Sequence, residues 1–95
     1  MPTFLMLSTL GPDGAATLHS NPGRLSQVNA EVEAIGVKVL HQWALLGQYD
    51  FCTVVEAPDL ETMSKVALAL GARGTLKTAT MGAIPADKLT AMLQG

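Results

Sequence analysis

The most constraining feature of this sequence is a pair of β-type runs separated by only two residues. Residues 37–46 (VKVLHQWALL) and 49–56 (YDFCTVVE) are rich in β-branched and aromatic residues, and Gly47-Gln48 joins them. A two-residue connection with glycine first is typical of a type II′ turn in a β-hairpin. The predicted hairpin register pairs Leu46 with Tyr49, Ala44 with Phe51, Gln42 with Thr53 and Leu40 with Val55.

Two further segments have the composition of strands. Residues 3–10 form a short apolar run closed by Gly11-Pro12-Asp13-Gly14, and this run is too short and too sharply bounded for a helix. Residues 75–81 (TLKTATM) have a similar β-type composition. We therefore predict four strands, with a short helix starting at Pro85 after the last of them.

Helical periodicity fills the two intervals between these strands. In the first interval, Asn21-Pro22 predicts a helix start with the asparagine as N-cap, and apolar side chains recur at helical spacing up to a stop at Gly36. Asp13 offers an earlier start, so one kinked helix and a turn followed by a helix both fit this interval. In the second interval, Asp59 predicts the N-cap of a helix and Gly71 its stop.

The predicted order of elements is strand, helix, strand, strand, helix, strand, followed by the short helix. This order is the split βαβ pattern of a ferredoxin-like α+β fold (βαββαβ), in which two helices pack on one face of a four-stranded antiparallel sheet. A chain of 95 residues has the length of one domain. We therefore expect one ferredoxin-like domain that spans residues 1–95.

The predicted strands are apolar on both faces, although the two helices cover only one face. Hydrophobic residues make up 48% of the chain and charged residues 15%, compared with about 25% charged residues in an average domain. A sheet face in contact with water is normally polar, whereas Phe4 and Met6 lie on one face of the first strand and Leu5 and Leu7 on the other. We therefore expect a second copy of the chain to cover the free face, in a homodimer or a higher homo-oligomer.

Charge and cysteine content exclude several classes of function. Six Lys and Arg residues are scattered along the chain against eight Asp and Glu residues, so there is no basic stripe for nucleic acid. No segment approaches the roughly 18 consecutive apolar residues of a membrane span. The single cysteine, Cys52, has no internal disulfide partner and no second ligand at zinc-type spacing. We expect a cytoplasmic protein that uses neither a metal nor an organic cofactor.

The hairpin carries the candidate catalytic residues. The predicted register places His41, Trp43 and Asp50 on one face, with Tyr49 at the hairpin mouth. Histidine titrates near neutrality, so we identify His41, Tyr49 and Asp50 as candidate catalytic residues, with Asp50 as base and Tyr49 as proton donor. Local roles compete with this hypothesis, because Asp50 is placed to cap the turn and Tyr49 to pack over the sheet edge. Trp43 is a candidate ligand-binding residue, with packing as the alternative.

Arg73 is a second candidate ligand-binding residue. It lies in Gly71-Ala72-Arg73-Gly74-Thr75, between the second predicted helix and the last strand. A phosphate-binding loop runs from a strand into a helix, which is the opposite order, so these glycines indicate a helix stop and a turn. Arg73 is placed either to neutralise the last helix carbonyls or to bind a carboxylate of a ligand or partner subunit.

Several separate motifs resemble those of the GYD-domain family. The family is named for a glycine, a tyrosine and an aspartate, which stand here in Gly47-Gln48-Tyr49-Asp50. The matching segments run along nearly the whole chain and comprise Thr3–Leu7, Asn21-Pro22, Ala44–Asp50, Val55–Asp59, Leu68–Thr75, Thr78, Thr80 and Ile84-Pro85. The resemblance implies a dimeric α+β barrel, in which two ferredoxin-like sheets pack against each other.

Two hypotheses about function are consistent with these patterns. In the first, the chain is a homo-oligomeric module that binds a small molecule or serves as a structural or regulatory subunit. In the second, it is an enzyme that resembles the cofactor-independent monooxygenases or isomerases of the barrel superfamily and acts on a small organic substrate. Convergence of His41, Tyr49 and Asp50 on an enclosed cavity favours the enzyme, whereas exposure or local hydrogen bonding of these side chains favours the module.

Overall fold

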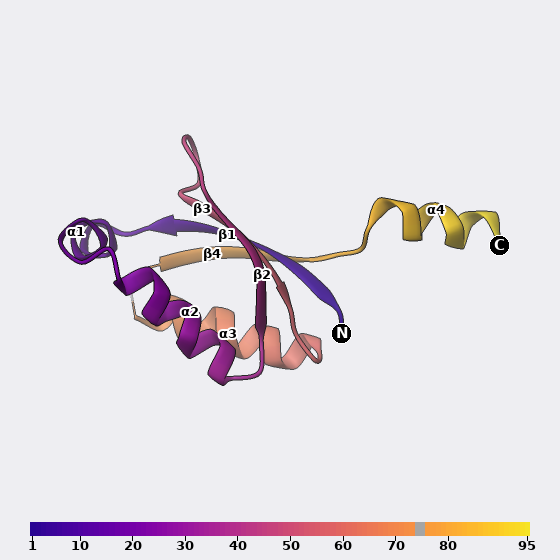
Figure 1. Cartoon of the computed structure of the whole chain (residues 1–95), viewed down its shortest axis with the longest axis horizontal. Coiled ribbons are helices and arrows are strands. Elements are labelled where there is room, and N and C mark those ends of the chain that lie inside the picture. The colour runs from indigo at the N-terminus through magenta and orange to yellow at the C-terminus, as the bar shows by residue number, and fades with distance from the viewer. Residues whose placement is uncertain (74–75) are drawn as a thin grey trace.

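The computed structural model describes residues 1–73 and 76–95 as one four-stranded antiparallel sheet with four helices (Figure 1). The strands are β1 (Thr3–Leu10), β2 (Lys38–Ala44), β3 (Phe51–Glu56) and β4 (Leu76–Ala83), in the spatial order β2-β3-β1-β4. The helices are α1 (Pro12–Ser20), α2 (Arg24–Ala34), α3 (Leu60–Ala72) and α4 (Ala86–Gln94). This order and the antiparallel pairing confirm the predicted ferredoxin-like α+β fold.

The strands agree with the prediction in number and order and differ at their ends. β1 covers the predicted residues 3–10, whereas β2 and β3 stop short of the predicted two-residue turn. The last backbone hydrogen bond before the loop runs from the N–H of Leu45 to the carbonyl of Asp50, at 2.8 Å. Gly47 has φ +134° in that loop, a conformation that favours glycine. In β4 the predicted first residue, Thr75, lies outside the described residues.

A β-bulge in β2 changes part of the predicted hairpin register. The pairs nearer the loop are as predicted: Ala44 with Phe51, Trp43 with Cys52, Gln42 with Thr53 and His41 with Val54. Beyond them the register shifts between Val39 and His41, so Val55 pairs with Val39 and the predicted pair of Leu40 with Val55 is wrong. A bulge inserts one extra residue into a strand, and the alternation of apolar side chains does not signal it.

The first predicted helical interval contains two helices. Asn21 is the C-cap of α1 and α2 begins three residues later, so the prediction of Asn21 as an N-cap is wrong. Gly36, with φ +105°, follows the end of α2 as predicted. The cap of α3 is also confirmed, because the Asp59 carboxylate accepts a hydrogen bond from the backbone N–H of Thr62 at 2.7 Å. The predicted stop at Gly71 is one residue early, since α3 continues to Ala72.

Helices α2 and α3 lie on one face of the sheet, and the core lies between them and the strands (Figure 1). The buried core residues are Phe4, Met6, Val32, Val37, Val55, Ala57, Met63, Val66 and Leu70. Helix α4 extends from the end of β4 away from this body, and none of its residues is buried. The radius of gyration of 14.4 Å accordingly exceeds the roughly 12 Å of a compact chain of this length.

Candidate functional site

The five candidate site residues do not share one enclosed cavity. His41 and Trp43 lie side by side on the exposed face of β2, with their rings stacked at a centroid distance of 5.3 Å. Arg73 follows the end of α3, on the helix side of the sheet. Tyr49 and Asp50 lie half-buried between β2 and β3. The catalytic and ligand-binding roles proposed for these residues remain predictions.

Asp50 joins the hairpin to the end of β1. Its carboxylate accepts a hydrogen bond from the backbone N–H of Leu10 at 2.7 Å, and its own N–H donates to the carbonyl of Ser8 at 2.8 Å. These bonds connect segments that are far apart in sequence, so Asp50 fixes the position of the hairpin loop relative to β1. Charge-assisted hydrogen bonds of this kind are stronger than neutral ones.

Replacing Asp50 with alanine is expected to lower the free energy of unfolding by about 1–2 kcal/mol, because the Leu10 N–H loses a charged acceptor in a half-buried position. The measurement is the midpoint of urea unfolding. As a control, Glu33→Ala removes an exposed carboxylate from α2 and is expected to change the unfolding free energy by less than about 0.5 kcal/mol. Equal midpoints for the two variants would contradict the anchoring role of Asp50.

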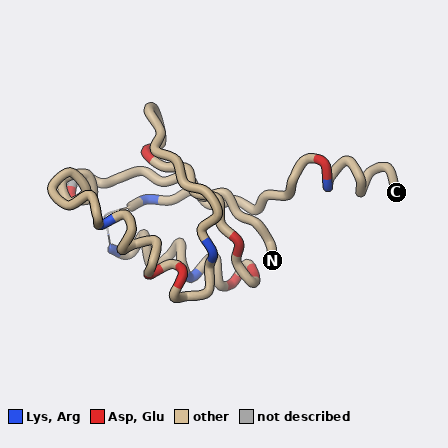
Figure 2. Tube along the Cα trace, viewed as in Figure 1, with Lys and Arg blue, Asp and Glu red and all other residues tan. Residues whose placement is uncertain are grey.

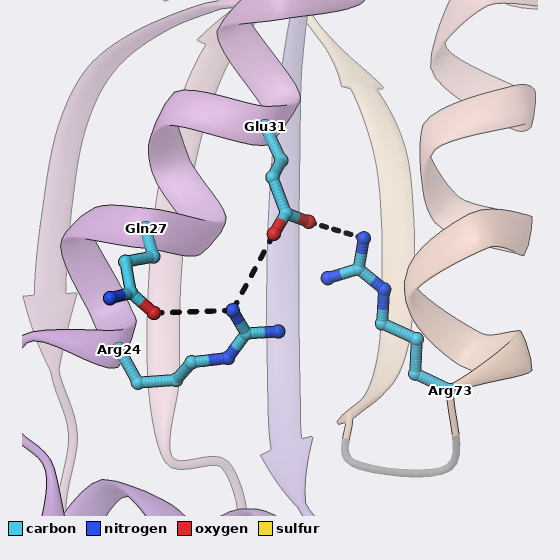
Figure 3. A network of polar contacts seen from close by, with 4 residues as sticks. All are labelled: Arg24, Gln27, Glu31 and Arg73. Carbon is cyan, nitrogen blue, oxygen red and sulfur yellow. Dashed lines mark hydrogen bonds and ion pairs between the residues drawn. The ribbon is translucent and has the colours of Figure 1, made fainter.

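A polar network links α2 to the end of α3 (Figure 3). The Arg24 guanidinium lies 3.5 Å from the Glu31 carboxylate and donates to the side-chain oxygen of Gln27 at 3.3 Å. Arg73 forms an ion pair with the second oxygen of Glu31. The carboxylate that Arg73 binds here thus belongs to its own chain. The hydrogen bond from Arg73 lowers the pKa of Glu31, and the positive charges of Arg73 and Arg24 act in the same direction.

The lowered pKa of Glu31 makes its contribution to stability depend on pH. A carboxylate whose pKa is lower in the folded state stabilises the fold above its ordinary pKa of 4.5, and this stabilisation is lost as the pH falls through the folded value. The Glu31→Gln variant should therefore be less stable than the parent chain at neutral pH. The difference should shrink as the pH falls below 4.5. A difference that stays constant across acid titration of thermal unfolding would contradict the ion-pair network.

A cavity of about 80 Å³, partly open to solvent, lies between the sheet and helices α1 and α2. Apolar side chains form most of its wall, and two buried hydroxyl residues, Ser8 and Thr53, are only 4% and 5% exposed. This cavity was not predicted from the sequence. The available signal was a polar residue at a core-facing position in each of two apolar strands.

An amide pair borders the polar side of the cavity. The side-chain N–H of Gln42 donates to the Thr53 hydroxyl at 3.1 Å and to the Asn29 side-chain oxygen at 3.3 Å. The side-chain N–H of Asn29 donates back to the Gln42 oxygen at 2.7 Å. These reciprocal bonds hold α2 against β2 and fix the orientation of the Thr53 hydroxyl oxygen.

The second face of the sheet carries no helix in the described residues and is mainly apolar. Cross-strand pairing places the following residues on it: Leu5, Leu7, His41, Trp43, Cys52, Val54, Ala79 and Met81. We call this surface the open face. Trp43 is 51% exposed and Met81 44% exposed. Charged residues are sparse along the middle of the strands (Figure 2). Apolar patches of this kind on a protein surface indicate an interaction site.

Two other apolar groups are exposed outside the open face. The loop between β2 and β3 rises on the side of the sheet opposite α2 and α3 (Figure 1), and Leu46 in this loop is fully exposed. Helix α4 carries Leu89, Met92 and Leu93 at helical spacing, all exposed. A nine-residue helix is shorter than the roughly 12–15 residues below which an isolated helix is only marginally stable in water, so packing against another surface would stabilise α4.

Within residues 1–73 and 76–95, no three His, Cys, Asp or Glu side chains are grouped so that they hold a metal ion. No helix of the described chain is long and apolar enough to cross a membrane.

Comparison with known proteins identifies the family. Residues 4–93 match the sequence model of the GYD domain. This chain belongs to the GYD-domain family. The match confirms the resemblance that the Gly-Gln-Tyr-Asp hairpin and the other motifs predicted. A curated relative from Thermus thermophilus is 52% identical over 95 residues, which is 99% of this GYD-domain chain and 100% of the relative. That relative is named "glutamine synthetase and cystathionine beta-lyase binding protein".

Solved structures support the fold of this GYD-domain chain. The crystal structure of FFRP-DM1 has a TM-score of 0.59 and 21% sequence identity, covering 88% of this chain and 100% of that one. The hypothetical protein PHS023 from Pyrococcus horikoshii has a TM-score of 0.57 and 21% identity, with coverages of 90% and 92%. At this level of identity the likeness concerns the fold alone.

Proposed function

We propose that this GYD-domain chain is a small regulatory protein that binds metabolic enzymes, with glutamine synthetase and cystathionine beta-lyase as its expected partners. The observation that carries this proposal is the 52% identity, over the whole length of both chains, to a relative named for binding these two enzymes. The geometry supports it, because a large apolar area is exposed on the open face, the hairpin loop and α4. The enzyme hypothesis draws no support from the geometry, since His41, Tyr49 and Asp50 share no enclosed cavity.

The proposal includes a homodimer in which two open faces pack against each other, as in a dimeric α+β barrel. Such an interface has two-fold symmetry, and each copy supplies the same apolar surface. Burying Trp43, Met81 and their neighbours removes apolar area from water, which is the main driving force for association. The loop between β2 and β3, which carries the exposed Leu46, rises on the same side of the sheet (Figure 1) and extends the contact. The proposal also places the protein in the cytoplasm, in keeping with its single, unbridged Cys52.

Binding of purified enzymes to the immobilised chain tests the proposal. Glutamine synthetase and cystathionine beta-lyase from the organism that makes this chain should each bind saturably. Free chain in solution should compete with the immobilised chain. An unrelated enzyme of similar size and net charge is the matched control, and it should not bind. If either named enzyme fails to bind, or if the control enzyme binds equally well, the proposed function is wrong.

A further inference from the structure

We propose that the cavity between the sheet and the α1–α2 pair is a binding site for a small, neutral and mainly apolar molecule that carries one hydrogen-bonding group. This inference rests on the cavity of a single chain and goes beyond enzyme binding. Most of the wall comes from β1, β2 and β3 on one side and from α1 and α2 on the other, and Leu70 of α3 and Leu76 of β4 complete it. The cavity is therefore distinct from the open face, which lies across the sheet.

The volume sets the size of the molecule. A single water needs about 10–15 Å³ of such space, whereas an apolar cavity of about 150 Å³ in another protein is large enough for benzene. The cavity here has about 80 Å³, so it suits a molecule of about four to five non-hydrogen atoms. Met6, Leu25, Val28 and Phe51 are among the side chains that form its apolar wall.

The buried hydroxyls set the position of the polar group. Ser8 on β1 and Thr53 on β3 both line the cavity and are almost completely buried. The Thr53 oxygen already accepts a hydrogen bond from Gln42, so its own hydrogen is available to an acceptor in the cavity. A hydroxyl or carbonyl oxygen of the bound molecule meets this requirement, and its aliphatic part then contacts the apolar wall.

The charges around the cavity favour a neutral molecule. Among the lining side chains that the structure describes, Arg24 is the only charged one. Its guanidinium already contacts Gln27 and Glu31 (Figure 3). An ion in the cavity would lose part of its hydration without gaining a free counter-charge, which is costly. A carboxylate of the same shape should therefore bind much more weakly than the corresponding alcohol.

A matched pair of probes tests the size, polarity and charge together. Isobutanol and isobutyrate have the same branched carbon skeleton and differ in charge. In a two-dimensional amide NMR titration of the full chain, isobutanol should shift the amides of Ser8, Val28 and Thr53 saturably, with a dissociation constant of about a millimolar. Isobutyrate should bind at least about tenfold more weakly. Equal binding of both probes, or isobutanol shifts confined to the open face, would overturn the proposal.

Two cavity variants and one control variant locate the site independently. Val28→Phe fills the cavity from α2 and should abolish isobutanol binding, whereas Leu68→Phe, on the exposed side of α3, should leave it unchanged. Ser8→Ala keeps the space and removes one hydroxyl, so it should weaken isobutanol binding and provides the test if Val28→Phe does not fold. Binding that survives both cavity variants unchanged would contradict the site. Because these experiments use the chain alone, they separate failure of this site from failure of enzyme binding.

Discussion

A Leu7→Asp substitution is expected to convert the proposed GYD-domain homodimer into monomers. Leu7 lies near the middle of the open face, paired with Cys52 on one side and Ala79 on the other. In a two-fold interface each substitution introduces two carboxylates. Their desolvation and mutual repulsion cost several kcal/mol, so the dimer dissociation constant should rise by about two orders of magnitude. Sedimentation equilibrium over a range of concentrations measures this change.

The control for Leu7→Asp is Ser26→Asp, which adds the same charge to the exposed surface of α2. This variant should dimerise like the parent chain, and circular dichroism should show that both variants keep the fold. A parent chain that sediments as a monomer at micromolar concentration would contradict the dimer itself. A Leu7→Asp chain that dimerises as tightly as Ser26→Asp would place the dimer contact on another surface.

A Met63→Ala substitution is expected to cause the largest loss of stability, about 2–5 kcal/mol. Met63 is 1% exposed and packs in the core between α3 and the sheet. Truncating it removes buried apolar atoms and leaves a cavity that the neighbouring side chains fill only in part. Because domains of this size have total stabilities of about 5–15 kcal/mol, the variant should approach the limit of folding. Urea unfolding at one fixed chain concentration measures the loss, since the proposed dimer would make the unfolding midpoint depend on concentration.

Lys65→Ala provides the comparison on the same helix. Its side chain is exposed on α3, so its loss should change the unfolding free energy by less than about 0.5 kcal/mol. If Met63→Ala unfolds at the same urea concentration as Lys65→Ala, the core assigned to the space between α3 and the sheet is wrong.

The sequence predicts the elements whose signals are local. Residues 3–10 are bounded by turn residues, and the structure has the strand in the same place. Asp59 has the side chain and position of an N-cap, and it caps α3. Composition also predicts correctly that both faces of the sheet are apolar. In the strand and the helix cap, the determining interactions lie within a few residues along the chain.

Features that depend on distant contacts are not predicted. The alternation of apolar residues along the sequence does not indicate the bulge after Val39. Asp50 looks like a turn cap in sequence, yet its carboxylate binds the Leu10 N–H across the sheet. The sequence left two roles open for Arg73, which were to neutralise the last helix carbonyls or to bind a carboxylate of a ligand or partner. In the structure its ion pair is with Glu31 on the neighbouring helix. The cavity depends on how α1 and α2 pack over the strands, which neither segment specifies alone.

Sedimentation velocity with purified glutamine synthetase tests the central claim most directly. The GYD-domain chain carries a fluorescent label, so that its own sedimentation is followed in the presence of increasing concentrations of the much larger enzyme. The proposed function predicts that the labelled chain moves with the enzyme boundary, in a fraction that saturates and that unlabelled chain displaces. A labelled chain that sediments at its own slow rate at every enzyme concentration would contradict the proposed function.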